Sequence, residues 1–163
     1  MKTREIVLGG LLTSLALLIP LAFGGVLGVV IPPFSATVAS HVPIMLAMTI
    51  SPATAIMVGL GSTLGFLIKL GPIIAARAFS HVIIGFIGAS LYKQGHPFYR
   101  VLLVTLPVHA LCEALIVLPF GLSLYDAGLV VGIGTVLHHT IDSLISLAVV
   151  KQLDFLRKAL ASE

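Results

Sequence analysis

Ionisable side chains occur in pairs inside the apolar segments of this chain. Each pair is separated by four residues, a spacing that puts both side chains on one face of a helix. The pairs are Arg77 and His81, His109 and Glu113, and His138 and Asp142, with His139 beside the last pair. An ionisable residue costs about 2.5–3.5 kcal/mol to insert into a membrane unless it has a partner or a water-filled site. Several of them on neighbouring helices therefore predict a polar binding cavity.

The predicted depths of these side chains are similar. At a rise of about 1.5 Å per residue, Arg77 lies about 8 Å and His81 about 14 Å below the outer end of their helix. Glu113 lies about 10 Å from the outer end of the next helix. His41 is predicted at the outer start of an earlier helix. The other candidates, near the middle of the membrane, are His109, His138 and His139. Asp142 is predicted to lie deeper, and we expect it to have a different role.

The composition requires that helices in a membrane position these residues. Of the 163 residues, 58% are hydrophobic and only 9% are charged, whereas an ordinary soluble domain has about a quarter charged residues. A span needs about 20 apolar residues, so the chain has room for six spans and no soluble domain. We expect an all-α integral membrane protein, with residues 1–163 forming a single six-helix transmembrane substrate-binding domain. The basic start followed by an apolar run is interpreted as a retained first span and not as a signal peptide.

Proline, glycine and the few charges divide the chain into spans. The predicted spans are 5–19, 36–51, 53–68, 72–93, 99–120 and 127–153. The segment 21–34 contains three glycines and two adjacent prolines and is nearly uncharged, which indicates an apolar loop. Lipid cannot satisfy bare backbone amides, so this loop must lie against protein or at the interface. We interpret it as a candidate lid over a pocket that opens outward.

The distribution of basic residues predicts the orientation. With six spans and the N-terminus inside, Lys69 is the only basic residue predicted at the outer ends of the spans. The cytoplasmic ends would carry Lys2, Arg4, Lys93, Arg100, Lys151, Arg157 and Lys158. Because cytoplasmic loops are enriched in lysine and arginine, both termini are expected in the cytoplasm of a bacterial cell, with the protein in its plasma membrane among lipid.

Several functional classes are excluded. Cys112 is the only cysteine, so the chain can form neither an internal disulfide nor a cysteine-based metal cluster. A glycine-rich phosphate loop and a G-x-S-x-G nucleophile motif are both absent, so neither ATP hydrolysis nor an enzyme activity is expected. No basic face with interleaved aromatic residues supports nucleic-acid binding. We expect no cofactor and no resident metal.

The chain resembles the substrate-binding S components of energy-coupling factor (ECF) vitamin transporters. The resemblance lies in the basic start, the segment 10–14 (GLLTS), the segment 41–45 (HVPIM) that leads to Ser51 and Pro52, and the six predicted spans. It implies that the protein captures a vitamin from outside and docks on an energy module of one transmembrane scaffold protein and two ATPases. The family docks through small residues one turn apart in the first span, and Gly10 and Ser14 occupy those positions.

Within that family the chain is most similar to the niacin-specific members, through the segments 75–81 (AARAFSH) and 109–114 (HALCEA). Arg77 could bind the carboxylate of nicotinate by a two-pronged hydrogen bond. His81 or His109 could bond the pyridine nitrogen, and Phe79 or Phe34 could cover the ring. Pyridoxine and a thiamine precursor stay open as alternative vitamins.

Two other functions stay open. The ionisable side chains of the last two spans, His109 and Glu113 in one and His138, His139 and Asp142 in the other, form a polar stripe on each helix. They offer nitrogen and oxygen ligands suited to zinc or a similar divalent ion, which would make the protein a metal transporter. Arg77 at the same depth argues against it, because its charge repels a cation. In a structural membrane subunit, by contrast, Arg77 and Glu113 would be a buried ion pair between helices, and each histidine would only bond a neighbouring carbonyl.

Overall fold

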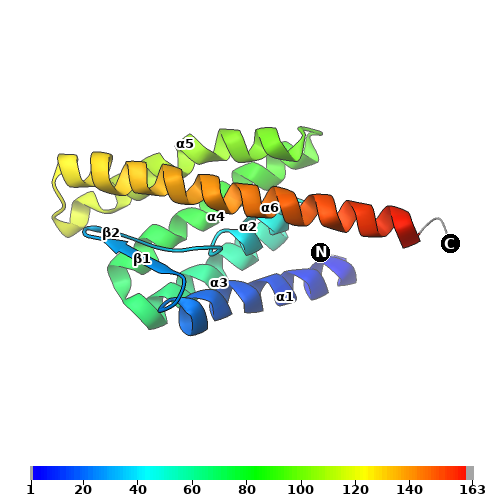
Figure 1. The fold of residues 1–163 in the computed structure, drawn as a ribbon, viewed down its shortest axis with the longest axis horizontal. Coiled ribbons are helices and arrows are strands. Elements are labelled where there is room, and N and C mark those ends of the chain that lie inside the picture. The colour runs from blue at the N-terminus through cyan, green and yellow to red at the C-terminus, as the bar shows by residue number, and fades with distance from the viewer. Residues whose placement is uncertain (1, 161–163) are drawn as a thin grey trace.

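Long apolar helices dominate the fold, as the composition predicts (Figure 1). The computed structural model describes residues 2–160, so residues 1 and 161–163 of the predicted single domain lie outside it. Five segments are long and apolar enough to cross a membrane. They contain the helices α1 Thr3–Leu18, α3 Pro52–Leu70, α4 Pro72–Lys93, α5 Phe98–Ile116 and α6 Ile133–Leu160, with π-helical turns over Ile19–Phe23 after α1 and Asp126–Gly132 before α6. These five segments coincide with the predicted spans 1, 3, 4, 5 and 6.

Local sequence signals explain the boundaries of α3 and α4. The Ser51 hydroxyl accepts a hydrogen bond from the Thr54 backbone N–H and so caps the start of α3, where Pro52 occupies the first turn. Gly71 ends this helix with a φ of 83°, a left-handed conformation that glycine adopts without strain. Pro72 starts α4 immediately afterwards. The two helices therefore pack antiparallel across a one-residue connection.

Helices α1 and α3 run in the same direction along the bundle. Gly61 of α3 faces Thr13 of α1, and Gly65 faces Leu17, so contacting positions increase together in the two helices. Figure 1 shows the start of α1 and the end of α6 at the same end of the bundle. The chain between α1 and α3 must therefore return along the whole bundle.

The return path differs from the prediction. Strands β1 Gly28–Ile31 and β2 Phe34–Thr37 form an antiparallel hairpin, in which Gly28 is paired with Thr37 and Ile31 with Phe34. Helix α2 Val42–Met48 has only seven residues, or about 10 Å of length. The continuous second span expected over 36–51 is wrong. Hydropathy indicates that a segment is buried, but it does not distinguish a helix in lipid from extended chain inside a protein.

Helix α2 forms the centre of the core. Its side chains Ile44, Met45, Ala47 and Met48 are at most 1% exposed. They pack with Val58 of α3 and with residues of α4 and α5. The N-terminal end of α2 points toward the hairpin end of the bundle (Figure 1).

Candidate ligand-binding site

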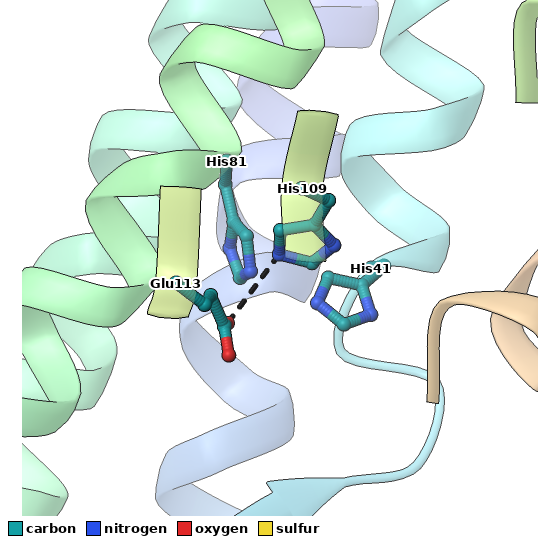
Figure 2. Close-up of side chains that lie close together, drawn as sticks. All are labelled: His41, His81, His109 and Glu113. Atoms are coloured by element: carbon teal, nitrogen blue, oxygen red, sulfur yellow. Dashed lines mark ion pairs between the residues drawn. The ribbon is translucent and has the colours of Figure 1, made fainter. Parts of the chain in front are cut away.

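Three separate elements bring four of the predicted site residues together. His41 precedes α2, His81 lies on α4, and His109 and Glu113 lie on α5. Figure 2 shows their side chains converging from these elements on one point. The ring centroid of His41 lies 4.6 Å from that of His81 and 4.6 Å from that of His109. All four residues are at most 5% exposed.

A close helix contact positions His81. A Cβ atom on Gly59 of α3 would come within 2.8 Å of the Val82 backbone nitrogen, so only glycine allows α4 to approach this closely. At this approach the Ser62 hydroxyl lies 2.9 Å from Nδ1 of His81. The contact orients the imidazole ring, and the Nε2 atom of His81 has no hydrogen bond among the residues that the structure describes.

Arg77 and Glu113 form a buried ion pair between α4 and α5. The Nε and Nη2 groups of Arg77 donate to Oε2 of Glu113 over 3.0 and 2.6 Å. The Thr135 hydroxyl of α6 donates to the same oxygen over 2.6 Å. Within residues 2–160, the Nη1 group of Arg77 has no hydrogen-bond partner although it is buried. One side of the guanidinium therefore keeps donor capacity for a ligand.

Phe34 of β2 packs against the same guanidinium. The Arg77 Cζ atom lies 5.3 Å from the centroid of the Phe34 ring, a distance suited to a cation–π contact. The ring occupies space left by Gly134 of α6, where a Cβ atom would come within 2.5 Å of it. Phe34 is 6% exposed. An aromatic residue of the hairpin is thus fixed beside the charged group.

Asp142 of α6 holds the irregular backbone before α2. Its Oδ1 atom accepts a hydrogen bond from the Ala39 N–H over 2.7 Å, and its Oδ2 atom accepts one from the His41 N–H over 2.9 Å. Nδ1 of His41 lies 2.9 Å from the same Oδ2. Nε2 of His138 lies 3.2 Å from that oxygen and 3.0 Å from the Thr37 carbonyl oxygen. Ala39 has a φ of 69°, so this carboxylate stabilises a strained turn.

A small cavity lies between the hairpin and these helices. Its volume is about 20 Å³, enough for roughly one water molecule. It is lined by Ser35, Ala36, Thr37, Ser40, His41, Phe66, Ile74, Arg77, Ala78, His81, Glu113 and His138. A cavity of this size holds no aromatic ring, and β2 supplies one of its walls. This arrangement, with β2 against the cavity, is called the closed form.

The remaining predicted residues occupy different places. His109 and His139 lie behind the cavity wall, their Nδ1 atoms 3.1 Å apart, and Nε2 of His139 is 3.2 Å from the Leu102 carbonyl oxygen. Phe79 is 46% exposed and does not join the cluster, so its expected role of covering a ligand is corrected. It is two residues from both Arg77 and His81, about 200° around the helix. That spacing already places it on the opposite face.

Two residues of the site have no counterpart in the sequence-based prediction. Ser62 and Thr135 contact His81 and Glu113, but small hydroxyl residues in apolar helices usually bond a carbonyl of their own helix. Thr135 also bonds the Val131 carbonyl in this way. Its position four residues before His139, on the polar stripe of α6, is the only signal that could have identified it.

Comparison with known proteins identified one curated relative. Over 94 residues the chain is 39% identical to the niacin transporter NiaX of Lactococcus lactis subsp. cremoris (strain MG1363). The match covers 57% of this chain and 41% of the relative, so the chain spans about two fifths of that protein's length. No family model and no solved structure matches the chain.

This similarity agrees with the resemblance to niacin-specific transporters that the sequence motifs indicated. It also supports the expectation that the chain is not an enzyme, because the relative is a transporter. Together with the five apolar helices, it identifies a multi-pass membrane protein.

Replacing the Asp142 carboxylate should destabilise the fold. In the Asp142→Asn variant one oxygen becomes an amide group that cannot accept hydrogen bonds, so at least one buried N–H loses its partner. We expect the free energy of unfolding to fall by about 1–3 kcal/mol, measured by thermal unfolding in detergent. The control is Asp126→Asn, a half-buried position in the turn before α6 whose change should stay within about 0.5 kcal/mol. Equal melting of both variants would show that Asp142 does not hold the return segment.

Proposed function

We propose that this chain is the substrate-binding S component of an ECF-type ABC importer in a bacterial plasma membrane, and that it captures niacin as its carboxylate form, nicotinate. The observation that carries the proposal is the buried Arg77 at the cavity wall, with one N–H group unpartnered among the described residues. The similarity to a niacin transporter supports the choice of vitamin. The import activity, the substrate and the partners are all part of this proposal.

Nicotinate combines the two features that this cavity matches. Its carboxylate is planar and anionic, which suits a two-pronged hydrogen bond from a guanidinium group. Its pyridine nitrogen accepts a hydrogen bond, and the neighbouring imidazole of His81 or His109 can donate one. Pyridoxine and thiamine precursors carry no carboxylate, so they would leave the guanidinium without a ligand partner. The buried Nη1 group of Arg77 would then stay without a hydrogen-bond partner, which costs about 1–3 kcal/mol, and this disfavours them.

Glu113 acts as the resting counter-ion of Arg77. In the closed form its carboxylate occupies two N–H groups of the guanidinium. When nicotinate enters, its carboxylate binds the free Nη1 side and shares the guanidinium with Glu113. Thr135 keeps Glu113 in place during this exchange, because its hydroxyl donates to the same oxygen. Arg77 therefore stays compensated whether the vitamin is present or absent.

The charged ends of the bundle support the orientation with both termini in the cytoplasm. The end that contains the start of α1 also contains Lys93 and Arg100, whereas the hairpin end contains Lys69. Basic residues concentrate on the cytoplasmic side of membrane proteins. The β-hairpin then faces outward, and the vitamin enters from that side. The return segment 24–51 makes the sixth crossing by a strand and a short helix instead of a long helix.

The outer face of α1 is suited to docking on the energy module. Gly10 and Ser14 are both exposed, and a Cβ atom on Gly10 would have no neighbour within 4 Å. The Ser14 hydroxyl donates to the Gly10 carbonyl over 2.9 Å, so its polarity is satisfied within the helix. Small residues one turn apart let another helix approach closely. The opposite face of α1 already packs on α3 through Gly61 and Gly65.

Removing the guanidinium should reduce the affinity for nicotinate. Charge-assisted hydrogen bonds contribute about 1.5–3 kcal/mol, so Arg77→Gln should weaken binding by about one to two orders of magnitude. Nicotinamide lacks the negative charge, so its affinity should fall much less in this variant. Titration calorimetry with both ligands measures the difference, and Arg77→Lys should recover only part of the affinity.

The control separates recognition from stability. The double variant Arg77→Gln with Glu113→Gln removes both charges and leaves neither one unpaired, so it keeps the charge balance of the core. This double variant should bind nicotinate and nicotinamide with similar affinities. If the single and double variants lost equal affinity for nicotinate and nicotinamide, Arg77 would be only a structural partner of Glu113, and the niacin assignment would fail.

Labelling of single cysteines checks the topology. In a Cys112→Ser background, a cysteine at Tyr125, which is 67% exposed, should react with an impermeant reagent added to whole cells. A cysteine at Gln94, at the opposite end of the bundle, should react only after the cells are permeabilised. The reverse pattern would place the hairpin and the cavity on the cytoplasmic side.

Bulky residues on the outer face of α1 should prevent coupling to the energy module. Gly10→Leu with Ser14→Leu should leave nicotinate binding by the isolated protein unchanged and abolish ATP-driven uptake in cells, because the helices can no longer approach. Leu11→Ala changes an exposed residue beside this pair and serves as the control. Normal uptake by the double variant would argue that docking uses another surface.

A further inference from the structure

We propose that His41, His81, His109 and Glu113 form a binding site for one divalent transition-metal ion, such as zinc. One ligand atom from each of the four residues lies within 4.8 Å of the other three. All four residues are buried, and Figure 2 shows that their side chains point toward one another. Such an ion goes beyond the proposed vitamin transport, which requires no metal.

Each of these four residues has a ring nitrogen or a carboxylate oxygen that makes no hydrogen bond with the described residues. Nδ1 of His41 contacts Asp142, and Nδ1 of His81 contacts Ser62. Within residues 2–160, the Nε2 atom of neither ring has a hydrogen bond. Nε2 of His109 is buried and has no hydrogen-bond partner in the described part of the chain, and it lies 3.4 Å from Oε1 of Glu113. Three imidazole nitrogens and one carboxylate oxygen therefore remain available together.

The partners of the opposite atoms match the usual surroundings of a metal site. A histidine that binds a metal generally donates its other ring N–H to a carboxylate, a carbonyl or a water, which orients the ring. Asp142 provides such a carboxylate for His41, and the Ser62 hydroxyl has the same role for His81. Arg77 and Thr135 hold the second oxygen of Glu113. Each of these ligands is thus oriented by a neighbour.

The distances require only a small contraction. In a tetrahedral site with bonds of about 2.0–2.1 Å, the ligand atoms lie about 3.3 Å apart. From a separation of at most 4.8 Å, each atom must move inward by about 1 Å or less. A second group, His41, His138 and Asp142, also has ligand spacing. Its atoms already bond one another and the backbone, so the first group is the favoured site.

The local charge favours a cation. Arg77 contributes one positive charge, and Glu113 and Asp142 contribute two negative charges, so the described charged groups around the cluster sum to −1 when the imidazoles are neutral. The ion pair also removes the earlier objection that Arg77 repels a metal, because its charge is compensated by Glu113. A divalent ion would change the sum to +1. Nicotinate would then bring it to zero, a step that rests on the proposed function. With the ion in place, His81 and His109 are metal ligands and do not donate to the pyridine nitrogen, so the carboxylate contact with Arg77 holds the vitamin.

Cobalt binding to the purified, untagged protein tests the site. Cobalt(II) replaces zinc in such sites and absorbs visible light strongly when its coordination is tetrahedral. After chelator treatment, loading and gel filtration, the wild type should retain one cobalt ion per chain and show this absorption. His81→Ala should lose both, whereas His96→Ala, an exposed histidine in the α4–α5 turn, should retain both. A wild type without cobalt, or equal cobalt in all three proteins, would overturn the proposal.

Two variants that each remove only a hydroxyl group test the site with less risk of unfolding the protein. Ser62→Ala removes only the hydroxyl that orients His81 and should weaken cobalt binding by about 10–100-fold. Thr63→Ala, on the adjacent residue, removes a hydroxyl that bonds the Gly59 carbonyl of its own helix and should have no effect. Equal affinities of these two variants would contradict the site. Since cobalt is titrated without vitamin, this result is independent of the nicotinate experiments.

Discussion

Backbone amides in the interior of a membrane protein must find hydrogen-bond partners, and two N–H groups of the segment before α2 depend on one carboxylate for this. Residues 38–41 are neither helix nor strand, yet they run between apolar helices, where neither water nor lipid provides hydrogen-bond partners for the backbone. Asp142 accepts from the N–H groups of Ala39 and His41 and also contacts the His41 ring. By binding this turn to α6, it determines where β2 and α2 lie. The position of His41 among the other imidazoles follows from it.

Glu113 organises the opposite wall in the same manner. One of its oxygens joins Arg77 of α4 to Thr135 of α6, and the other faces His109 on its own helix. The two carboxylates thus connect the turn before α2 with α6, and α4 with α5 and α6, around the cavity. This polar network costs desolvation energy, which excellent geometry offsets. Under the proposed function, an Arg77 that is compensated at rest can exchange partners with a ligand without exposing a bare charge.

The hairpin is the element of the site with the fewest constraints. All of β1 is exposed, and β2 contributes Phe34 and Thr37 to the interior. Its inner face covers the cavity, whose present volume is too small for an aromatic ligand. The helices behind it are fixed by close contacts such as that of Gly59 with Val82.

The sequence by itself determined the class of protein, five of the long helices and the polar stripes, because hydropathy and the helical period depend on residues near one another in the chain. Gly71 and Pro72 already marked the turn between α3 and α4. Tertiary structure alone decided three matters. It made the segment 36–51 a strand and a short helix, because burial by protein and burial by lipid have the same hydropathy. It brought Phe34 instead of Phe79 to Arg77. It also placed Asp142 where its carboxylate accepts the backbone N–H of His41, 101 residues away. Such contacts join residues distant in the chain, and no local pattern encodes them.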